Sequence, residues 1–99
     1  MPWQGTLFRF NAQTVMASGP RTAGVYALWS HDRWIYIGQS ADICERLLGH
    51  LSDEHACIAR ERPSGFGFEL ISDADHRDAR QSELIRELAP VCTCRRLEL

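Results

Sequence analysis

Two tyrosines, each beside a glycine, are the residues of this sequence best suited to act together on a substrate. The chain reads Gly-Val-Tyr up to Tyr26 and Tyr-Ile-Gly from Tyr36 to Gly38, with ten residues from one tyrosine to the other. A phenol with a reference pKa of about 10 takes up a proton at neutral pH only with help from a cationic neighbour or a metal-bound hydroxide. Arg46, whose planar fork of donors suits phosphate, and His50 follow four residues apart. These four side chains are candidates for phosphate and proton-transfer chemistry.

The segments that carry the tyrosines predict a β-hairpin. Residues 24–29 and 34–38 are rich in β-branched and aromatic side chains, and the polar residues 30–33 connect them. The two tyrosines then lie on adjacent strands, where their phenols could converge. The flanking glycines, Gly24 and Gly38, would let backbone or ligand approach closely.

A helix that begins at Asp42 is expected to present Arg46 and His50. Asp42 and Glu45 form a capping box, and apolar residues recur along one stripe of the following segment. Arg46 and His50 are four residues apart and should project side by side from a neighbouring stripe. Residues 53–62 fit either further helical turns or a mobile connection.

The rest of the chain predicts a third strand, a last helix and an N-terminal extension. Residues 67–71 favour a strand, and Asp73 or Asp75 can cap a helix that runs through Leu88 before Pro90 stops it. Residues 1–22 form the extension, with a strand-like stretch at 7–10 and a short helix after Asn11. The extension could add a strand, cover an edge or dimerise, but we favour ordinary packing.

We therefore predict one α+β core, with a small three-stranded antiparallel sheet flanked by helices in the order β-β-α-β-α. Ninety-nine residues allow one domain, divided here into the extension 1–22 and a core at 23–99. All eleven basic residues are Arg, yet the formal charge is −2. This net negative charge argues against a protein that binds nucleic acid non-specifically over a wide surface. It is still compatible with a local Arg-lined binding site.

No apolar run approaches the roughly 20 residues of a membrane span, and no signal peptide begins the chain. We therefore expect a cytoplasmic protein with no membrane contact. The four cysteines should then stay reduced, and their spacing does not suit zinc. These cysteines are Cys44, Cys57, Cys92 and Cys94.

Residues 23–93 resemble the GIY-YIG nuclease family. The resemblance depends on the two glycine-tyrosine triplets, on the helix with Arg followed by His, and on the Leu84-Ile85 pair followed by Pro90. The resemblance implies hydrolysis of DNA phosphodiesters with one Mg²⁺ or Mn²⁺ ion. It makes Tyr26 the general base or its positioner, with Tyr36 and His50 orienting it and the water. Arg46 would bind a phosphate oxygen and offset the charge of the transition state.

The chain departs from the family where the metal ligand should be. The family has a Glu three residues before the Leu-Ile pair, and Gln81 stands there. A neutral amide holds a hard cation poorly, so catalysis should be impaired. The near-isosteric change fits an engineered substitution, which we favour, or a natural member that has lost or altered cleavage. Glu83 is the fallback ligand, although it shares a helix stripe with Glu87 and should face solvent.

Two smaller departures concern the substrate. Many members have a basic residue at the position of Gln39 and an Asn at that of Thr93. We predict substrate binding by these residues together with Gly38 and Ser40. The expected partner is DNA, single-stranded or a short or structured duplex, with a second copy or a protein partner left open. The alternative to an endonuclease is a non-catalytic module that binds nucleic acid or protein on the same scaffold.

Overall fold

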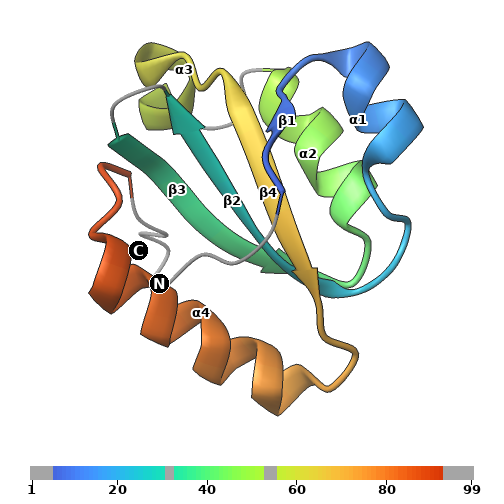
Figure 1. Ribbon diagram of the computed structural model, residues 1–99, viewed down its shortest axis with the longest axis vertical. Helices are drawn as coiled ribbons and strands as arrows, with labels where there is room; N and C mark the ends of the chain where they lie inside the picture. The colour runs from blue at the N-terminus through green and yellow to red at the C-terminus, as the bar shows by residue number, and fades with distance from the viewer. Residues whose placement is uncertain (1–5, 31–32, 53–55, 93–99) are drawn as a thin grey trace.

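The structure, a computed structural model, describes residues 6–30, 33–52 and 56–92. Within these residues a four-stranded antiparallel sheet has α4 on one face and α1, α2 and α3 on the other (Figure 1). The strands are β1 (Phe8–Arg9), β2 (Gly24–Ser30), β3 (Arg33–Ser40) and β4 (Gly65–Leu70). The helices are α1 (Ala12–Ser18), α2 (Ile43–Leu51), α3 (Ala56–Glu61) and α4 (Ala74–Leu88).

The α+β class and the predicted hairpin are confirmed. The strand order is β1-β4-β2-β3, so the hairpin β2-β3 places β2 inside the sheet and β3 at its edge. The register sets Tyr26 opposite Gly38 on the edge strand. In an antiparallel sheet such opposed residues are the closest neighbours across two strands.

The expected three strands are one too few, because the N-terminal extension adds β1 beside β4. Phe8 stacks on Phe66 and Phe68, with ring centroids 5.4 and 5.8 Å apart. Burying these aromatic faces together favours strand pairing over loose packing. Strand β4 also begins two residues earlier than expected, because Gly65 pairs with Arg9 and Trp29.

Alternate residues of β2 contribute to two separate cores. Tyr26 and Leu28 are buried among side chains of α1, α2 and α3. Val25 and Ala27 are buried on the opposite face, against Leu84 of α4. This period of two is what a strand buried on both faces requires.

Side-chain caps fix where the two main helices begin. The Asp42 carboxylate accepts a hydrogen bond from the Glu45 backbone N–H, which confirms the predicted start of α2. Asp73, and not Asp75, caps α4 by accepting from the His76 N–H. The open choice at residues 53–62 resolves to helix α3 over its described part. Among the helices that the structure describes, none is both long and apolar enough to cross a membrane.

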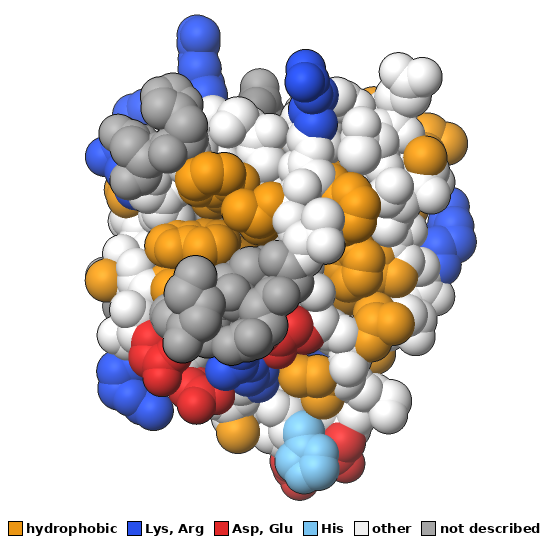
Figure 2. Space-filling view, in the orientation of Figure 1, with side chains coloured by type: hydrophobic (Ala, Val, Ile, Leu, Met, Phe, Trp, Pro, Cys, Tyr) orange, Lys and Arg blue, Asp and Glu red, His pale blue; other side chains and the backbone are white. Residues whose placement is uncertain are grey.

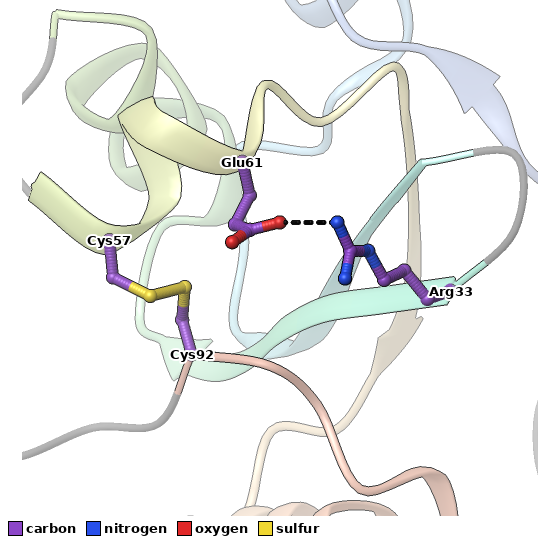
Figure 3. The surroundings of a disulfide bond; sticks show 4 residues. All are labelled: Arg33, Cys57, Glu61 and Cys92. Atoms are coloured by element: carbon purple, nitrogen blue, oxygen red, sulfur yellow. Dashed lines mark ion pairs between the residues drawn. A yellow bond between two sulfur atoms is a disulfide. The ribbon is translucent and has the colours of Figure 1, made fainter.

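A disulfide between Cys57 and Cys92 overturns the prediction of reduced cysteines (Figure 3). Helix α3 carries Cys57, and the segment after α4 returns to β3, where the Cys92 N–H donates to the Ile35 carbonyl at 2.7 Å. The two Cα atoms lie 5.9 Å apart, within the range that a disulfide spans. The spacing of cysteines in a sequence does not show such proximity. Cys44 is free and buried, and Cys94 lies outside the described residues.

We predict that the disulfide stabilises the fold by about 3–4 kcal/mol, because it closes a loop of 35 residues in the unfolded chain. Urea unfolding with and without a reducing agent measures this difference. The double variant Cys57→Ala/Cys92→Ala is the control, since its free energy of unfolding should not respond to the reductant. Equal stability of the oxidised and reduced natural chain would contradict the prediction.

Candidate active site

Tyr26, Tyr36 and His50 form one buried cluster between the hairpin and α2. The Tyr26 hydroxyl and His50 Nε2 lie 2.8 Å apart, in hydrogen-bond contact. The Tyr36 ring meets the His50 ring edge-on, with centroids 5.4 Å apart, and the two tyrosine rings are 6.1 Å apart. The convergence expected of the two phenols and the imidazole is therefore present in the fold.

Gly38 leaves the space that the Tyr26 ring occupies. A Cβ built on Gly38 would lie 2.5 Å from Tyr26 Cζ and 2.8 Å from Tyr36 Cε2, and it would also overlap the Tyr26 hydroxyl. Both distances are far inside van der Waals contact, so any larger residue would displace the rings. Glycine is needed here for close approach rather than for an unusual backbone angle.

Arg46 is in a different environment from His50, although both belong to α2. Its side chain is exposed and lines a pocket of about 330 Å³ together with Ser40, Glu45 and Gly49. His50 is 8% exposed. The predicted pair is thus divided into a surface cation and a buried imidazole.

Ser40, at the end of β3, shapes the entry into α2. Its hydroxyl donates to the Asp42 carbonyl and accepts from the Asp42 N–H, both at 3.0 Å. These two bonds hold the wall of the Arg46 pocket close to the helix N-terminus. Ser40 therefore positions the pocket that it lines.

Gln81 lies on the face of α4 that packs on the sheet, as its place on the helix predicts. Its Nε2 donates to the Ile37 carbonyl at 3.3 Å, and its Oε1 accepts from Gln39 Nε2 at 2.8 Å. Both ends of the Gln81 amide are therefore engaged with the edge strand β3. A carboxylate at this position could accept from Gln39 but could not donate to Ile37.

The same amide group of Gln39 also contacts two residues that sequence reasoning did not single out. Gln39 Nε2 donates to Asp78 Oδ1 at 2.5 Å, and Arg77 Nε donates to Gln39 Oε1 at 3.3 Å. Asp78 is three residues before Gln81, so both belong to one face of α4. The three-residue spacing from Gln81 is the sequence feature that could have predicted Asp78 on the same helix face.

Glu83, the fallback ligand, is half-exposed and belongs to another set of contacts. Arg80 binds it at 2.7 Å and also binds Glu69 of β4 through two bonds of 2.8 and 2.9 Å. The hydrogen bond to Glu69 is the main reason that the pKa of Arg80 is raised above its ordinary value, with Glu83 adding to it. Glu83 thus helps to join α4 to β4. Thr93, the last predicted site residue, lies outside the described residues.

Strand β3 brings the tyrosine cluster and the glutamine network close together. Gly38 touches the Tyr26 ring, and the next residue, Gln39, reaches Gln81 and Asp78 from α4. Side chains of consecutive strand residues point to opposite faces, so the tyrosine cluster lies on the face covered by α2 and the glutamine contacts on the face covered by α4. Over the described ranges, no group of three or more His, Cys, Asp or Glu side chains lies together where it could hold a metal ion.

The arrangement of the helices and strands is similar to that in solved structures of one nuclease domain. The chain is similar to the GIY-YIG N-terminal endonuclease domain of UvrC from Thermotoga maritima. Its magnesium-bound form superposes with a TM-score of 0.68 at 20% identity, over 79% of this chain and 89% of that one. A point mutant of the domain, bound to its catalytic divalent cation, gives 0.69 at 20% identity over 79% and 88%. The chain has the GIY-YIG nuclease fold.

Neither a protein-family model nor a curated protein sequence matches the chain. The GIY-YIG fold is therefore established by the arrangement of elements and not by overall sequence likeness. The four-stranded sheet still contains the expected three strands, with β1 added at the far edge. The roles of individual residues depend on the geometry described above.

We predict that Tyr26 and His50 stabilise the fold as a coupled pair. Tyr26→Phe removes a buried hydrogen bond and should lower the free energy of unfolding by about 1–3 kcal/mol. In a double-mutant cycle with His50→Leu, the coupling energy should be about 0.5–3 kcal/mol. If the loss of stability in the double variant equals the sum of the losses in the two single variants to within about 0.3 kcal/mol, the two groups do not interact.

Proposed function

We propose that this chain is a DNA endonuclease of the GIY-YIG fold, which hydrolyses phosphodiester bonds with a divalent metal ion. The main support for the proposal is the hydrogen-bond contact between the Tyr26 hydroxyl and His50 Nε2. This contact lies beside Gly38 on the edge strand of the sheet. The similar UvrC domain is an endonuclease domain bound to magnesium, which supports the same chemistry here.

Tyr26 is the residue placed to handle the proton of the attacking water. When His50 Nε2 is unprotonated, the Tyr26 hydroxyl donates to it and its oxygen lone pairs become better acceptors. The phenol can then take a proton from water as it gives its own to the imidazole. Tyr36 packs against both rings and restricts their orientations.

Arg46 is placed to bind the phosphate. Its guanidinium is exposed, and the pocket that it lines, about 330 Å³, is large enough for a phosphate group. Arginine binds phosphate oxygens through two parallel hydrogen bonds and offsets the negative charge that develops in the transition state. Ser40 in the same pocket is the candidate for a further hydrogen bond to the substrate.

The metal ion would be held from α4. Gln81 Oε1 is a hard oxygen of the kind that Mg²⁺ and Mn²⁺ prefer, although here it accepts a hydrogen bond from Gln39 Nε2. When bound, the ion would stabilise the leaving oxygen. Gln81 contributes no charge, so we infer that turnover is impaired relative to a carboxylate at this position.

The charge distribution favours a short or single-stranded substrate. Figure 2 shows Arg side chains separated from one another around the visible face, with acidic side chains near those at its lower edge. The formal net charge is −2. A long duplex groove needs a continuous basic surface, whereas a single phosphate needs one Arg-lined pocket.

A non-catalytic binding module is the second candidate, and two observations favour it. Tyr26 is 1% exposed, so water reaches its hydroxyl only if the cluster opens. Both ends of the Gln81 amide bond to β3, as a structural residue would. Such a module would keep the Arg46 pocket and bind DNA without cutting it.

Restoring a carboxylate at position 81 separates the two functions. We expect Gln81→Glu to raise Mg²⁺- or Mn²⁺-dependent cleavage of labelled DNA by about 100-fold or more, because the site gains the charge that holds the ion. Single-stranded, duplex and branched DNA should be tested, with Gln13→Glu on the exposed face of α1 as the control for an added charge.

Adding Tyr26→Phe to Gln81→Glu should remove the gained cleavage. If Gln81→Glu remains inactive on every substrate while the natural chain binds DNA, the endonuclease proposal fails and the binding module replaces it. Equal cleavage by the natural chain and by Gln81→Glu would show that position 81 does not limit the reaction.

A further inference from the structure

We propose that a pocket between Arg9 of β1 and Trp29 of β2 binds one nucleotide of a single-stranded DNA substrate. The proposal rests on the proposed function for the choice of DNA as the source of that nucleotide. The chemistry of the pocket, a cation beside an aromatic ring, comes from residues that the proposed catalytic reaction does not use.

Three neighbouring strands place Arg9, Gly65 and Trp29 in one row across the sheet. The register sets Arg9 opposite Gly65 of β4, and Gly65 opposite Trp29. Phe8 packs with the core on the α2 side of the sheet, so the next side chain, that of Arg9, points to the α4 side. Because the middle residue of the row is glycine, no side chain separates the guanidinium from the indole on this face.

Gly65 leaves the space that the Trp29 ring occupies. A Cβ built on Gly65 would overlap Trp29 Nε1 and lie 2.7 Å from Trp29 Cδ1. The indole therefore leans over β4, toward β1. Trp34 contacts the indole from β3, with ring centroids 6.0 Å apart, and Trp29 remains partly exposed. The ring is thus held in one orientation while part of its surface stays accessible to a ligand.

The space around this row is a pocket of about 550 Å³. This volume is within the range of about 300–1,000 Å³ that is typical of small-molecule sites. The pocket lining combines the apolar Leu7, the aromatic Trp29 and the cationic Arg9 with the polar Asn11 and Ser64. Among the lining residues that the structure describes, none is a carboxylate. The pocket is therefore positively charged in a chain whose net charge is −2.

Hydrogen-bond donors in this pocket are available to a ligand. Within the described part of the chain, the Arg9 guanidinium forms no ion pair and the Trp29 indole N–H donates to no protein group. The Asn11 side chain uses its Oδ1 to accept from the Thr14 N–H, which leaves its amide N–H groups for other partners. An Arg donor suits a phosphate, and an aromatic ring beside it suits a stacked base. A nucleotide carries both groups.

The pocket is separate from the tyrosine cluster and from the Arg46 pocket. Helix α4 packs on β3 and β2, and its Arg80 reaches β4 at Glu69, so the start of β4 carries the pocket instead. Trp29 is five residues along β2 from Gly24, about 17 Å, and Gly24 pairs with Ser40 of the Arg46 pocket. A strand that contacts both pockets must span more than one nucleotide. Two attachment points on one strand then bind more tightly than either alone.

Binding of single-stranded DNA by the full chain, measured with a chelator present to prevent cleavage, tests the assignment. The probe is a fluorescent oligothymidylate of about 15 nucleotides, followed by fluorescence anisotropy. Arg9→Gln should weaken binding by about 10-fold. It should also make the slope of log K against log salt shallower by about 0.7, because one phosphate contact is lost. Trp29→Leu should weaken binding by about 5-fold or more, since a stacked base is lost.

Arg86→Gln is the matched control, because Arg86 is an exposed Arg that does not line the pocket. Its affinity and its salt slope should equal those of the natural chain. Thymidine monophosphate should bind the natural chain at least about 100-fold more weakly than the oligonucleotide. Circular dichroism confirms that the variants fold.

Unchanged affinity and salt slope in Arg9→Gln would overturn the proposal. Thymidine monophosphate that binds as tightly as the oligonucleotide would overturn it too, by identifying a free nucleotide as the ligand. The outcome is separate from that of the proposed function. Loss of DNA binding in Arg9→Gln, with no cleavage by Gln81→Glu, would support the pocket and reject the endonuclease. Cleavage by Gln81→Glu, with DNA binding unaffected by Arg9→Gln, would reject the pocket and keep the endonuclease.

Discussion

The missing side chain at Gly38 is the constraint on which the site depends. Strand β3 is the edge of the sheet, and Gly38 is the position where the Tyr26 ring lies directly against its backbone. A methyl group there would overlap both tyrosine rings, so the contact between Tyr26 and His50 requires glycine.

Several elements hold this edge in place. On one face α2 presents His50 to Tyr26, and on the other α4 presents Gln81 to the Ile37 carbonyl. Further along β3, the Cys92 N–H binds the Ile35 carbonyl, and the disulfide joins Cys92 to α3. Outward carbonyls of an edge strand need partners, and here a backbone segment and a glutamine side chain provide them.

Local patterns predicted most of the fold, and long-range contacts account for what they missed. The hairpin, the caps at Asp42 and Asp73, and the inward position of Gln81 follow from strand composition, capping chemistry and helical spacing. The pairing of β1 with β4 and the disulfide depend on segments distant in the chain, which no local pattern specifies. The hydrogen bond between Gln39 and Asp78 was missed because it joins residues 39 positions apart in the chain.

The glutamines at positions 39 and 81 join β3 to α4, because Gln39 Nε2 donates to Gln81 Oε1 while Gln81 Nε2 donates to the Ile37 carbonyl. A crystal soaked in Mn²⁺ and measured for anomalous scattering tests the central claim most directly, namely that this chain holds a divalent cation through Gln81 of α4. The account predicts a peak that touches Gln81 Oε1 beside β3. A peak beside Glu83 and Arg80, or none near α4, would contradict it.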